Sequence, residues 1–449
     1  MVLKRWFPLL LVPVLLALPL GAASYKVQHL NDSLAVGDGC SLREAILAHN
    51  SSNLKGANEC GAFDPGADTI EFLTGVTGTL RLNPALGELV LTEPALTLQG
   101  PGASLLSISG GKVMSVLVLD RDRPPVFTLR GVTIRNGLGS PAMPGGINGQ
   151  GGGIRMEIGG TIPANPTTIV VEDSVFLSNS VPFEGASRGA AITSYGSLVL
   201  RRSLVRFNQS DFGAIFHFGD ALIEDSEFSD NLGQYLGSAV VLYPPGPWTV
   251  RRTLFRDNVD QQDGPSGLLL VGTSGSGVVE NCTFTGNSSS TGSVVMTQAP
   301  ITVRNSTFYA NRVTGYPGGG GVLHVDLSTV RLVSNLFGKH ELRDVSVNPN
   351  YGAAIDATYN LFHDVAANLP PGTVCATSTL GGANLCGVTN AGVGPLGAHG
   401  GPTWTIPLLS SSPAINAGFA PWTLLTDQRG PGFARTAGLG TDIGAFEAQ

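Results

Sequence analysis

An apolar anchor recurs along the middle of the chain at intervals of 23 to 29 residues, and an asparagine follows each anchor three positions later. The anchors are Phe176, Val205, Phe228, Phe255, Phe284 and Phe308, and the asparagines are Asn179, Asn208, Asn231, Asn258, Asn287 and Asn311. A period of this length is typical of a solenoid whose repeats stack into one continuous core. Asparagine suits the turn after each anchor because it tolerates a left-handed backbone.

The residue four positions before each anchor is charged, and its sign alternates from one repeat to the next. This column contains Glu172, Arg201, Glu224, Arg251, Glu280 and Arg304, and the next position holds Asp173, Arg202, Asp225, Arg252, Asn281 and Asn305. Strands in stacked coils lie roughly 4.8 Å apart, where alternating charges are favourable and like charges are costly. The sequence therefore predicts an all-β fold, a right-handed parallel β-helix (solenoid) with capped ends. Because each carboxylate has an arginine on a neighbouring coil, we interpret both columns as structural.

The first 23 residues predict a signal peptide. Lys4 and Arg5 precede an apolar run, and Gly21 and Ala23 stand at the cleavage positions. We expect an exported chain, secreted or held at the cell envelope, with no membrane span after cleavage. The net charge of −7 argues against nucleic acid as a partner.

Five cysteines in an exported chain favour disulfides. Cys40 with Cys60, and Cys375 with Cys386, close short local loops. Cys282 is left over in a column of small interior residues, so we expect a buried free thiol rather than a nucleophile. Ser41 and Glu44 have the spacing of a capping box, which predicts a short helix over the first coil.

The two ends resemble known families. Residues 40–46 (CSLREAI) match the signature of bacterial exported proteins with a CSLREA domain, and residues 68–72 and 98–102 resemble later segments of the same proteins. The stretches 400–405, 411–418, 426–430 and 442–447 resemble the choice-of-anchor Q domain. The repeats are similar to those of polymorphic outer membrane proteins, which are implicated in adhesion. The expected organisation is a signal peptide at 1–23, a CSLREA-type cap with the first coils at 24–95, a β-helix at 96–365 and a choice-of-anchor-Q-like cap at 366–449.

Asp230 and Asp257 are the best candidates for catalysis. Both follow their anchors by two residues, so we expect them one coil apart, where like charges can share a proton or a cation. A solvated turn is the competing interpretation. If the site is catalytic, the reaction is that of a polysaccharide lyase or glycoside hydrolase on acidic polysaccharide, and Ca²⁺ is expected only in the lyase case. No other cofactor and no metal site is indicated, since the seven histidines lack metal-ligand spacing.

A second strand in each repeat looks apolar on both faces. One face aligns Phe216, Val241, Leu269, Val295 and Leu323, with Tyr195, Phe218 and Tyr243 two residues further on. The chain's own loops or C-terminal segment, another protein, or a glycan stacked on Tyr195, Phe218 and Tyr243 are the alternatives for what covers this face.

These patterns favour a non-enzymatic adhesin or carbohydrate-binding protein, with a polysaccharide or surface glycoprotein as partner. A polysaccharide lyase or glycoside hydrolase is the alternative. Both rest on fold and resemblance more than on a site.

Overall fold

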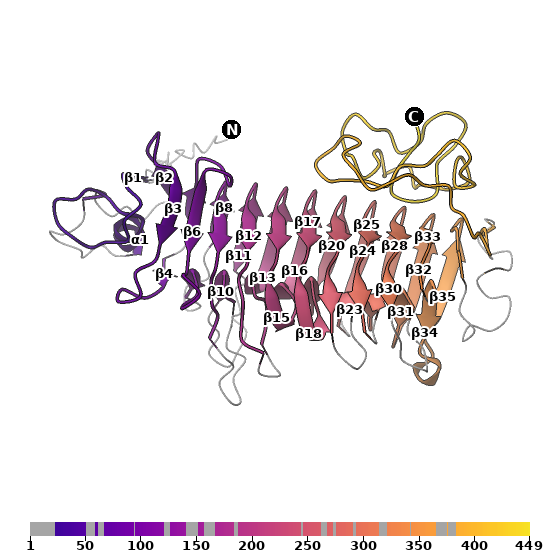
Figure 1. The fold of residues 1–449 in the computed structure, drawn as a ribbon, viewed down its shortest axis with the longest axis horizontal. Coiled ribbons are helices and arrows are strands. Elements are labelled where there is room, and N and C mark those ends of the chain that lie inside the picture. The colour runs from indigo at the N-terminus through magenta and orange to yellow at the C-terminus, as the bar shows by residue number, and fades with distance from the viewer. Residues whose placement is uncertain are drawn as a thin grey trace, which may run out of the picture.

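The strands stack into a solenoid of parallel β-sheets, which confirms the predicted fold class (Figure 1). The structure, a computed structural model, describes residues 23–50, 59–61, 67–93, 95–120, 126–140, 151–156, 167–183, 187–243, 246–261, 267–272, 275–290, 293–313, 321–341, 343–364, 375 and 383–449. The expected signal peptide, apart from Ala23, lies outside the described residues.

Three sheets, called A, B and C, line the solenoid. Sheet B takes one strand from each coil: β3 (Gly78–Arg81), β6 (Leu106–Ser109), β9 (Thr133–Arg135), β12 (Val175–Leu177), β14 (Leu204–Arg206), β17 (Glu227–Ser229), β21 (Leu254–Arg256), β25 (Thr283–Thr285), β29 (Thr307–Tyr309) and β33 (Leu336–Gly338). Sheet C contains β15 (Gln209–Phe212), β18 (Leu232–Gly237), β22 (Val259–Asp260), β26 (Ser288–Ser289) and β30 (Arg312–Val313).

Sheet A is the largest sheet, and most coils contribute two segments to it. Its strands are β1 (Ser24–Val27), β2 (Asp68–Phe72), β4 (Leu89–Leu91), β5 (Leu96–Gln99), β7 (Leu117–Leu119), β8 (Val126–Arg130), β10 (Ile154–Met156), β11 (Thr168–Glu172), β13 (Ile192–Arg201), β16 (Ile215–Glu224), β19 (Val240–Leu242), β20 (Pro247–Arg251), β23 (Gly267–Val271), β24 (Ser276–Glu280), β27 (Ser293–Thr297), β28 (Ile301–Arg304), β31 (Leu323–Val325), β32 (Thr329–Val333), β34 (Val345–Val347) and β35 (Ala354–Thr358).

The anchors predicted from the sequence form the spine of the core. Phe228, Phe255, Phe284 and Phe308 stack face to face, with ring centroids 4.6–5.0 Å apart. Phe337 and Phe362 continue the stack, and all these rings are fully buried. Registered strands place each ring directly over the last, because the side chain one coil on occupies the same position of the same sheet.

The asparagines form a second buried column at the turn after sheet B. Each side-chain amide donates to the Oδ1 of the asparagine one coil on, at 2.9–3.0 Å from Asn179 through to Asn311. Each amide also donates to a backbone carbonyl, as Asn258 does to Phe228 at 2.9 Å. Buried polar groups are tolerated in a core only when they are paired, and this column meets that condition for its amide donors.

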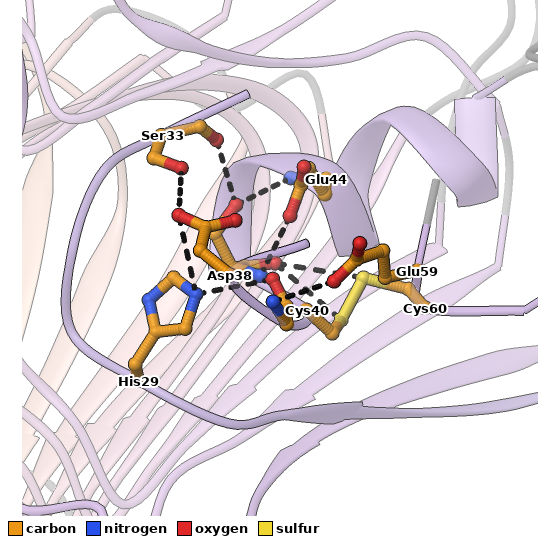
Figure 2. The surroundings of a disulfide bond; sticks show 9 residues. His29, Ser33, Asp38, Cys40, Glu44, Glu59 and Cys60 are labelled. Carbon is orange, nitrogen blue, oxygen red and sulfur yellow. Dashed lines mark hydrogen bonds and ion pairs between the residues drawn. A yellow bond between two sulfur atoms is a disulfide. The ribbon is translucent and has the colours of Figure 1, made fainter. Parts of the chain in front are cut away.

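The N-terminal unit closes the first coil as expected. Helix α1 (Leu42–Asn50) begins with the predicted capping box, in which the Ser41 N–H donates to Glu44 Oε2 at 2.9 Å and the Glu44 N–H donates to Ser41 Oγ at 3.1 Å. The Cys40–Cys60 disulfide ties this unit to the segment after the helix, and the Glu59 carboxylate accepts from the Gly39 N–H beside it (Figure 2). The Cys375–Cys386 disulfide is also present.

The C-terminal segment, residues 383–449, starts by stacking on the last coil: Leu385 bridges Leu361, and Asn360 Nδ2 donates to Asn384 Oδ1 at 3.0 Å. The rest of the segment runs back along the outside of sheet B, over the coils of β21 to β33 (Figure 1, yellow). The outward side chains of β25 and β29 are uncharged and bond to the covering chain: Thr283 Oγ1 donates to Gln428, and Thr307 Oγ1 accepts from the Ala445 N–H. The first residues of the segment therefore cover the last coil as a cap does, whereas most of the segment packs along the side of the solenoid.

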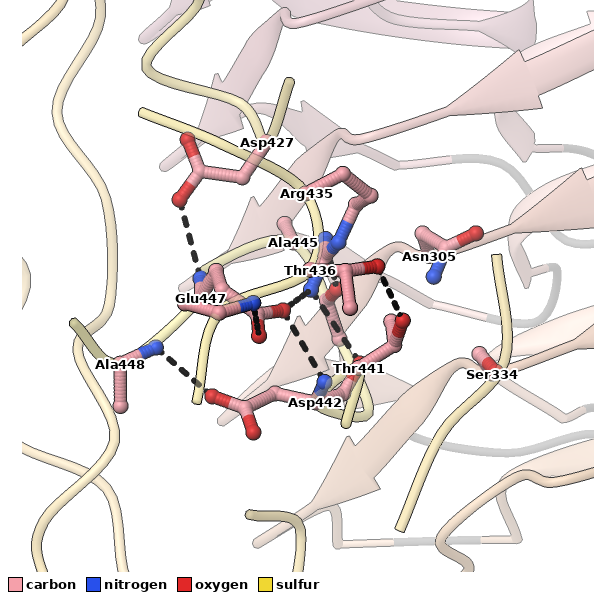
Figure 3. A network of polar contacts seen from close by, with 12 residues as sticks. Asn305, Ser334, Asp427, Arg435, Thr436, Thr441, Asp442, Ala445, Glu447 and Ala448 are labelled. Carbon is pink, nitrogen blue, oxygen red and sulfur yellow. Dashed lines mark hydrogen bonds and ion pairs between the residues drawn. The ribbon is translucent and has the colours of Figure 1, made fainter. Parts of the chain in front are cut away.

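Buried ion pairs hold the C-terminal segment together. Arg435 pairs with Glu447 at 2.8 Å and Arg429 with Asp427 at 2.6 Å, and all four side chains are buried. Figure 3 shows Asp427, Arg435, Asp442 and Glu447 gathered against the solenoid, where Arg435 also donates to Asn281 at 3.3 Å. Each carboxylate accepts backbone N–H groups as well, which reduces the cost of burying its charge.

Candidate functional site

The alternating charges form one continuous row on the outer face of sheet A. Strand register places Glu172, Arg201, Glu224, Arg251, Glu280 and Arg304 directly beside one another, and Arg130 extends the row by one coil. Arg251 Nε donates to Glu224 at 2.7 Å, and Arg304 Nε donates to Glu280 at 2.9 Å. Successive side chains of a strand point alternately to the core and to the surface. Because the stacked strands share one register, the charged residues all point to the surface.

The arginines and the glutamates of this row are buried to different extents. The arginine side chains are 26–46% exposed, whereas the glutamate side chains are 7–10% exposed. The longer arginine reaches over its shorter neighbour, packs its methylene groups against the sheet and places its guanidinium outermost. We call this feature the guanidinium row and define it as Arg130, Arg201, Arg251 and Arg304. It is cationic toward solvent although the column as a whole is nearly neutral.

A less polar column runs beside the guanidinium row. Its members point outward from the same strands two positions earlier and are half-buried: Val170, Val199, Leu222, Thr249, Val278 and Thr302. The outer face of sheet A therefore offers an apolar strip along one side and hydrogen-bond donors along the other, both running parallel to the solenoid axis.

Glu224 is the most heavily paired carboxylate of the column. Arg201 lies 2.6 Å, Arg251 2.6 Å and Arg252 3.0 Å from its oxygens. Burial alone would raise the pKa of Glu224, but the hydrogen bond from Arg251 and the charges of the three arginines outweigh it and hold the pKa below its ordinary value.

Lowering the pH is expected to destabilise the protein through Glu224. A depressed folded-state pKa means that the stabilisation is fully present above the unfolded-state pKa, about 4.3. It is lost as the pH falls through the lower folded-state pKa. Urea unfolding midpoints at about pH 7 and about pH 3 measure the loss. The Glu224→Gln variant should show a smaller difference between the two, and the exposed Glu341→Gln should keep the wild-type difference. An unchanged pH dependence in Glu224→Gln would contradict this role.

The structure places Asp230 and Asp257 in adjacent coils, as their spacing predicts, at turns with positive φ. Each carboxylate pairs with an arginine: Arg206 donates to Asp230 at 2.8 Å, and Arg256 to Asp257 at 3.0 Å. Arg256 also donates to Glu227 at 2.9 Å and lies 5.9 Å from the ring of Trp404. These neighbours supply the charge compensation that a shared proton or cation would otherwise provide.

The aromatic column proposed as a glycan platform is largely covered. Tyr195 is 3% exposed and stacks on Phe218 at 6.1 Å, while Tyr243 turns toward Phe216 at 5.7 Å. Burial raises the pKa of the Tyr195 hydroxyl. A sugar ring needs an exposed aromatic face, so Tyr195 is a poor platform in this arrangement.

The sequence alignment of this second strand was shifted by one residue from Leu269 onward. Register places Leu269, Val295 and Leu323 in the core line with Ile215 and Val240. The outward line continues from Phe216 and Val241 to Leu270 and Met296 instead. The chain itself covers this line: Arg188 lies over the Phe216 ring at 5.0 Å, and Phe212 contacts Phe216 edge to face at 6.2 Å. The error arose because both faces are apolar here, which removes the alternation that fixes register.

The Cys282 and His217 side chains serve the core. Burial raises the pKa of the free Cys282 thiol to about 12, so it is not a nucleophile at neutral pH. Burial lowers the pKa of His217 to about 4, and the ring bonds Ser194 Oγ at 2.9 Å and the Asp220 carbonyl at 2.9 Å. Among the described residues, no three His, Cys, Asp or Glu side chains are grouped to hold a metal ion. No helix of the described residues is long and apolar enough to cross a membrane.

Comparison with known proteins supports the architecture. Residues 120–337 match a family model described as the right handed beta helix region. The chain is a right-handed parallel β-helix. No curated protein sequence matches it significantly. Among solved structures, the crystal structure of pectate lyase Pel9A aligns with this β-helix at a TM-score of 0.46 and 12% identity, covering 95% of this chain and 96% of that chain. Similarity at this level carries no argument about function.

Proposed function

We propose that this protein is an exported, non-enzymatic β-helix that binds acidic polysaccharide along the outer face of sheet A. One observation carries the proposal: the arginines of the guanidinium row lie outermost, and the glutamates between them are buried beneath. A guanidinium has five N–H donors in a planar fork, so an arginine that pairs with glutamate keeps donors for a second carboxylate or a sulfate.

The spacing of the row fits a polymer rather than a small anion. An arginine recurs at every second coil, roughly every 9.6 Å for strands about 4.8 Å apart. A polysaccharide lying along the axis, with an acidic group repeated at about that interval, contacts several arginines at once and gains affinity from each added contact. The adjacent strip of Val199, Leu222 and Val278 accepts the apolar C–H faces of the sugar rings.

Export is part of the same proposal. The two disulfides fit an oxidising compartment, secreted or at the cell envelope. The signal-like first 23 residues, the CSLREA-like and choice-of-anchor-Q-like ends, and the repeats similar to those of polymorphic outer membrane proteins support the same location. A surface glycoprotein carrying acidic glycans is an equivalent partner. Binding through arginine needs no cofactor; Ca²⁺ would enter only if the protein were a lyase.

Retention on immobilised polysaccharides tests the proposal. The mature protein should bind alginate, hyaluronan and polygalacturonate, should not bind neutral dextran, and should elute with added salt, which screens exposed charges. The double variant Arg201→Gln, Arg251→Gln should bind at least about tenfold more weakly, because each charge-assisted hydrogen bond contributes about 1.5–3 kcal/mol. Glu172 keeps Arg130 and Glu224 keeps Arg252 in this variant, so the column stays paired.

The matched control is Arg312→Gln, which removes an exposed arginine paired with Glu341 away from the row. It should bind like wild type. Equal binding of the double variant and wild type would overturn the assignment to the guanidinium row. New reducing or unsaturated ends on any of these polysaccharides would overturn the non-enzymatic proposal and make Asp230 and Asp257 the first residues to test.

A further inference from the structure

Two loops of the C-terminal segment expose large apolar side chains almost completely. Trp422 is 89% exposed, Leu425 75% and Leu439 96%. Neither loop has a charged residue, from Phe419 to Thr426 or from Thr436 to Thr441. A group of apolar side chains this exposed has a cost in water, which commonly marks a surface that meets a partner.

Backbone pairing brings both loops to the same end of one small unit. Antiparallel bridges join Gly418 to Thr441, Ala437 to Gly440 and Thr426 to Ala434. Because these bridges are antiparallel, the chain at Gly418 runs toward the 437–440 turn, and the chain at Thr426 runs away from that turn. The loop 419–425 arches over the end at which the 437–440 turn also lies. We call this end the apolar tip and define it by Trp422, Leu425 and Leu439.

The tip is fixed to the solenoid at both feet of its larger loop. Asn305 Nδ2 donates to the Phe419 carbonyl at 3.1 Å, and Asn281 Nδ2 donates to the Thr426 carbonyl at 2.8 Å. These two asparagines stand where earlier coils carry Asp173, Arg202, Asp225 and Arg252. The change from charge to amide thus coincides with the docking of the loop. Arg435, which lies just before the 437–440 turn in the chain, forms a buried pair with Glu447 (Figure 3).

We infer that the apolar tip inserts into the surface of a zwitterionic lipid bilayer. A bilayer deforms around a convex apolar projection, whereas a folded partner needs a matching hollow and a sugar needs hydrogen-bond donors beside the aromatic ring. Tryptophan favours the boundary between headgroups and acyl chains, and leucine favours the acyl region below it. The absence of charge on both loops makes the contact independent of anionic lipid. This inference is separate from polysaccharide binding, because the guanidinium row lies on sheet A.

Flotation of the mature protein with phosphatidylcholine vesicles tests the inference. Wild type should float with the vesicles, to the same extent at low and high salt. The double variant Trp422→Ser, Leu439→Ser should partition on the order of a hundredfold more weakly. Tryptophan fluorescence should shift to shorter wavelength with vesicles, and Trp422→Phe should remove that shift. Trp248 is buried, and Trp404, although 49% exposed, lies beside Arg256 of β21 and not in the tip.

Val36→Ser is the matched control, since Val36 is 72% exposed in the N-terminal unit, far along the chain from the tip. It should float like wild type, and all variants should keep the wild-type unfolding midpoint. Wild type that stays unbound, a double variant that binds equally, or binding only to vesicles with added phosphatidylglycerol and lost in salt would each overturn the inference. So would self-association that the double variant abolishes, since the tip would then meet a second copy.

Discussion

Replacing Phe255 with alanine is expected to lower the free energy of unfolding by about 3–5 kcal/mol. The ring is fully buried and stacks on Phe228 at 5.0 Å and on Phe284 at 4.6 Å, so its removal leaves a cavity bounded by two rings that registered strands hold apart. The backbone cannot collapse to fill that space without breaking the pairing of β21 with β17 and β25. Urea unfolding followed by circular dichroism measures the change.

Phe207→Ala provides the control. Phe207 lies in the turn after β14, is 43% exposed and contacts Arg206 rather than the stack. Its replacement should change stability by no more than about 0.5 kcal/mol. A loss below about 1 kcal/mol in Phe255→Ala would contradict a rigid stacked spine and indicate that neighbouring coils relax into the space.

Replacing Arg435 with methionine is expected to cost about 3–5 kcal/mol, because it leaves the buried Glu447 carboxylate without its counter-charge. The side chains of this pair are 1% and 0% exposed. The loss should fall on the C-terminal segment first, because Arg435 also donates to Asn281 of the solenoid. Limited proteolysis should therefore release fragments of residues 383–449 before the β-helix is cut, and urea unfolding gives the magnitude.

Two further variants separate charge from packing. Arg435→Met combined with Glu447→Gln removes both charges and should recover part of the lost stability. Arg312→Met breaks an exposed pair with Glu341 and should cost at most about 1 kcal/mol. If Arg435→Met is no more susceptible to protease than Arg312→Met, the buried pair does not hold the segment in place.

Periodicity determined most of the solenoid from sequence. The spacing of Phe228, Phe255 and Phe284 with their asparagines fixes both length and register, because a stacked coil must return each residue type to the same position. The alternation of Glu224 with Arg251 gave the same register independently. The sequence pattern did not reveal Arg130 as a member of the charged column. Arg130 lies four residues before Ile134, as the other charged residues lie before their anchors, but this coil has glycine at 137 where the others have asparagine.

Periodicity could not predict how deeply each side chain is buried or which distant segments of the chain pack together. The sequence pairs arginine with glutamate but does not say which of the two lies outermost, and that order comes from side-chain length over a flat sheet. The position of the C-terminal segment depends on contacts such as Asn281 with Thr426, which are 145 residues apart. Asn281 and Asn305 do carry a signal, since they interrupt the charged column where the segment docks. The exposure of Trp422 follows only from that docking.

A crystal structure of the protein with an acidic oligosaccharide that it retains is the most direct measurement. The bound chain should lie along the solenoid axis on sheet A, with acidic groups on Arg201 and Arg251 and sugar rings over Val199 and Leu222. An oligosaccharide bound across Asp230 and Asp257, or on Tyr243, would contradict the assignment of polysaccharide binding to the guanidinium row.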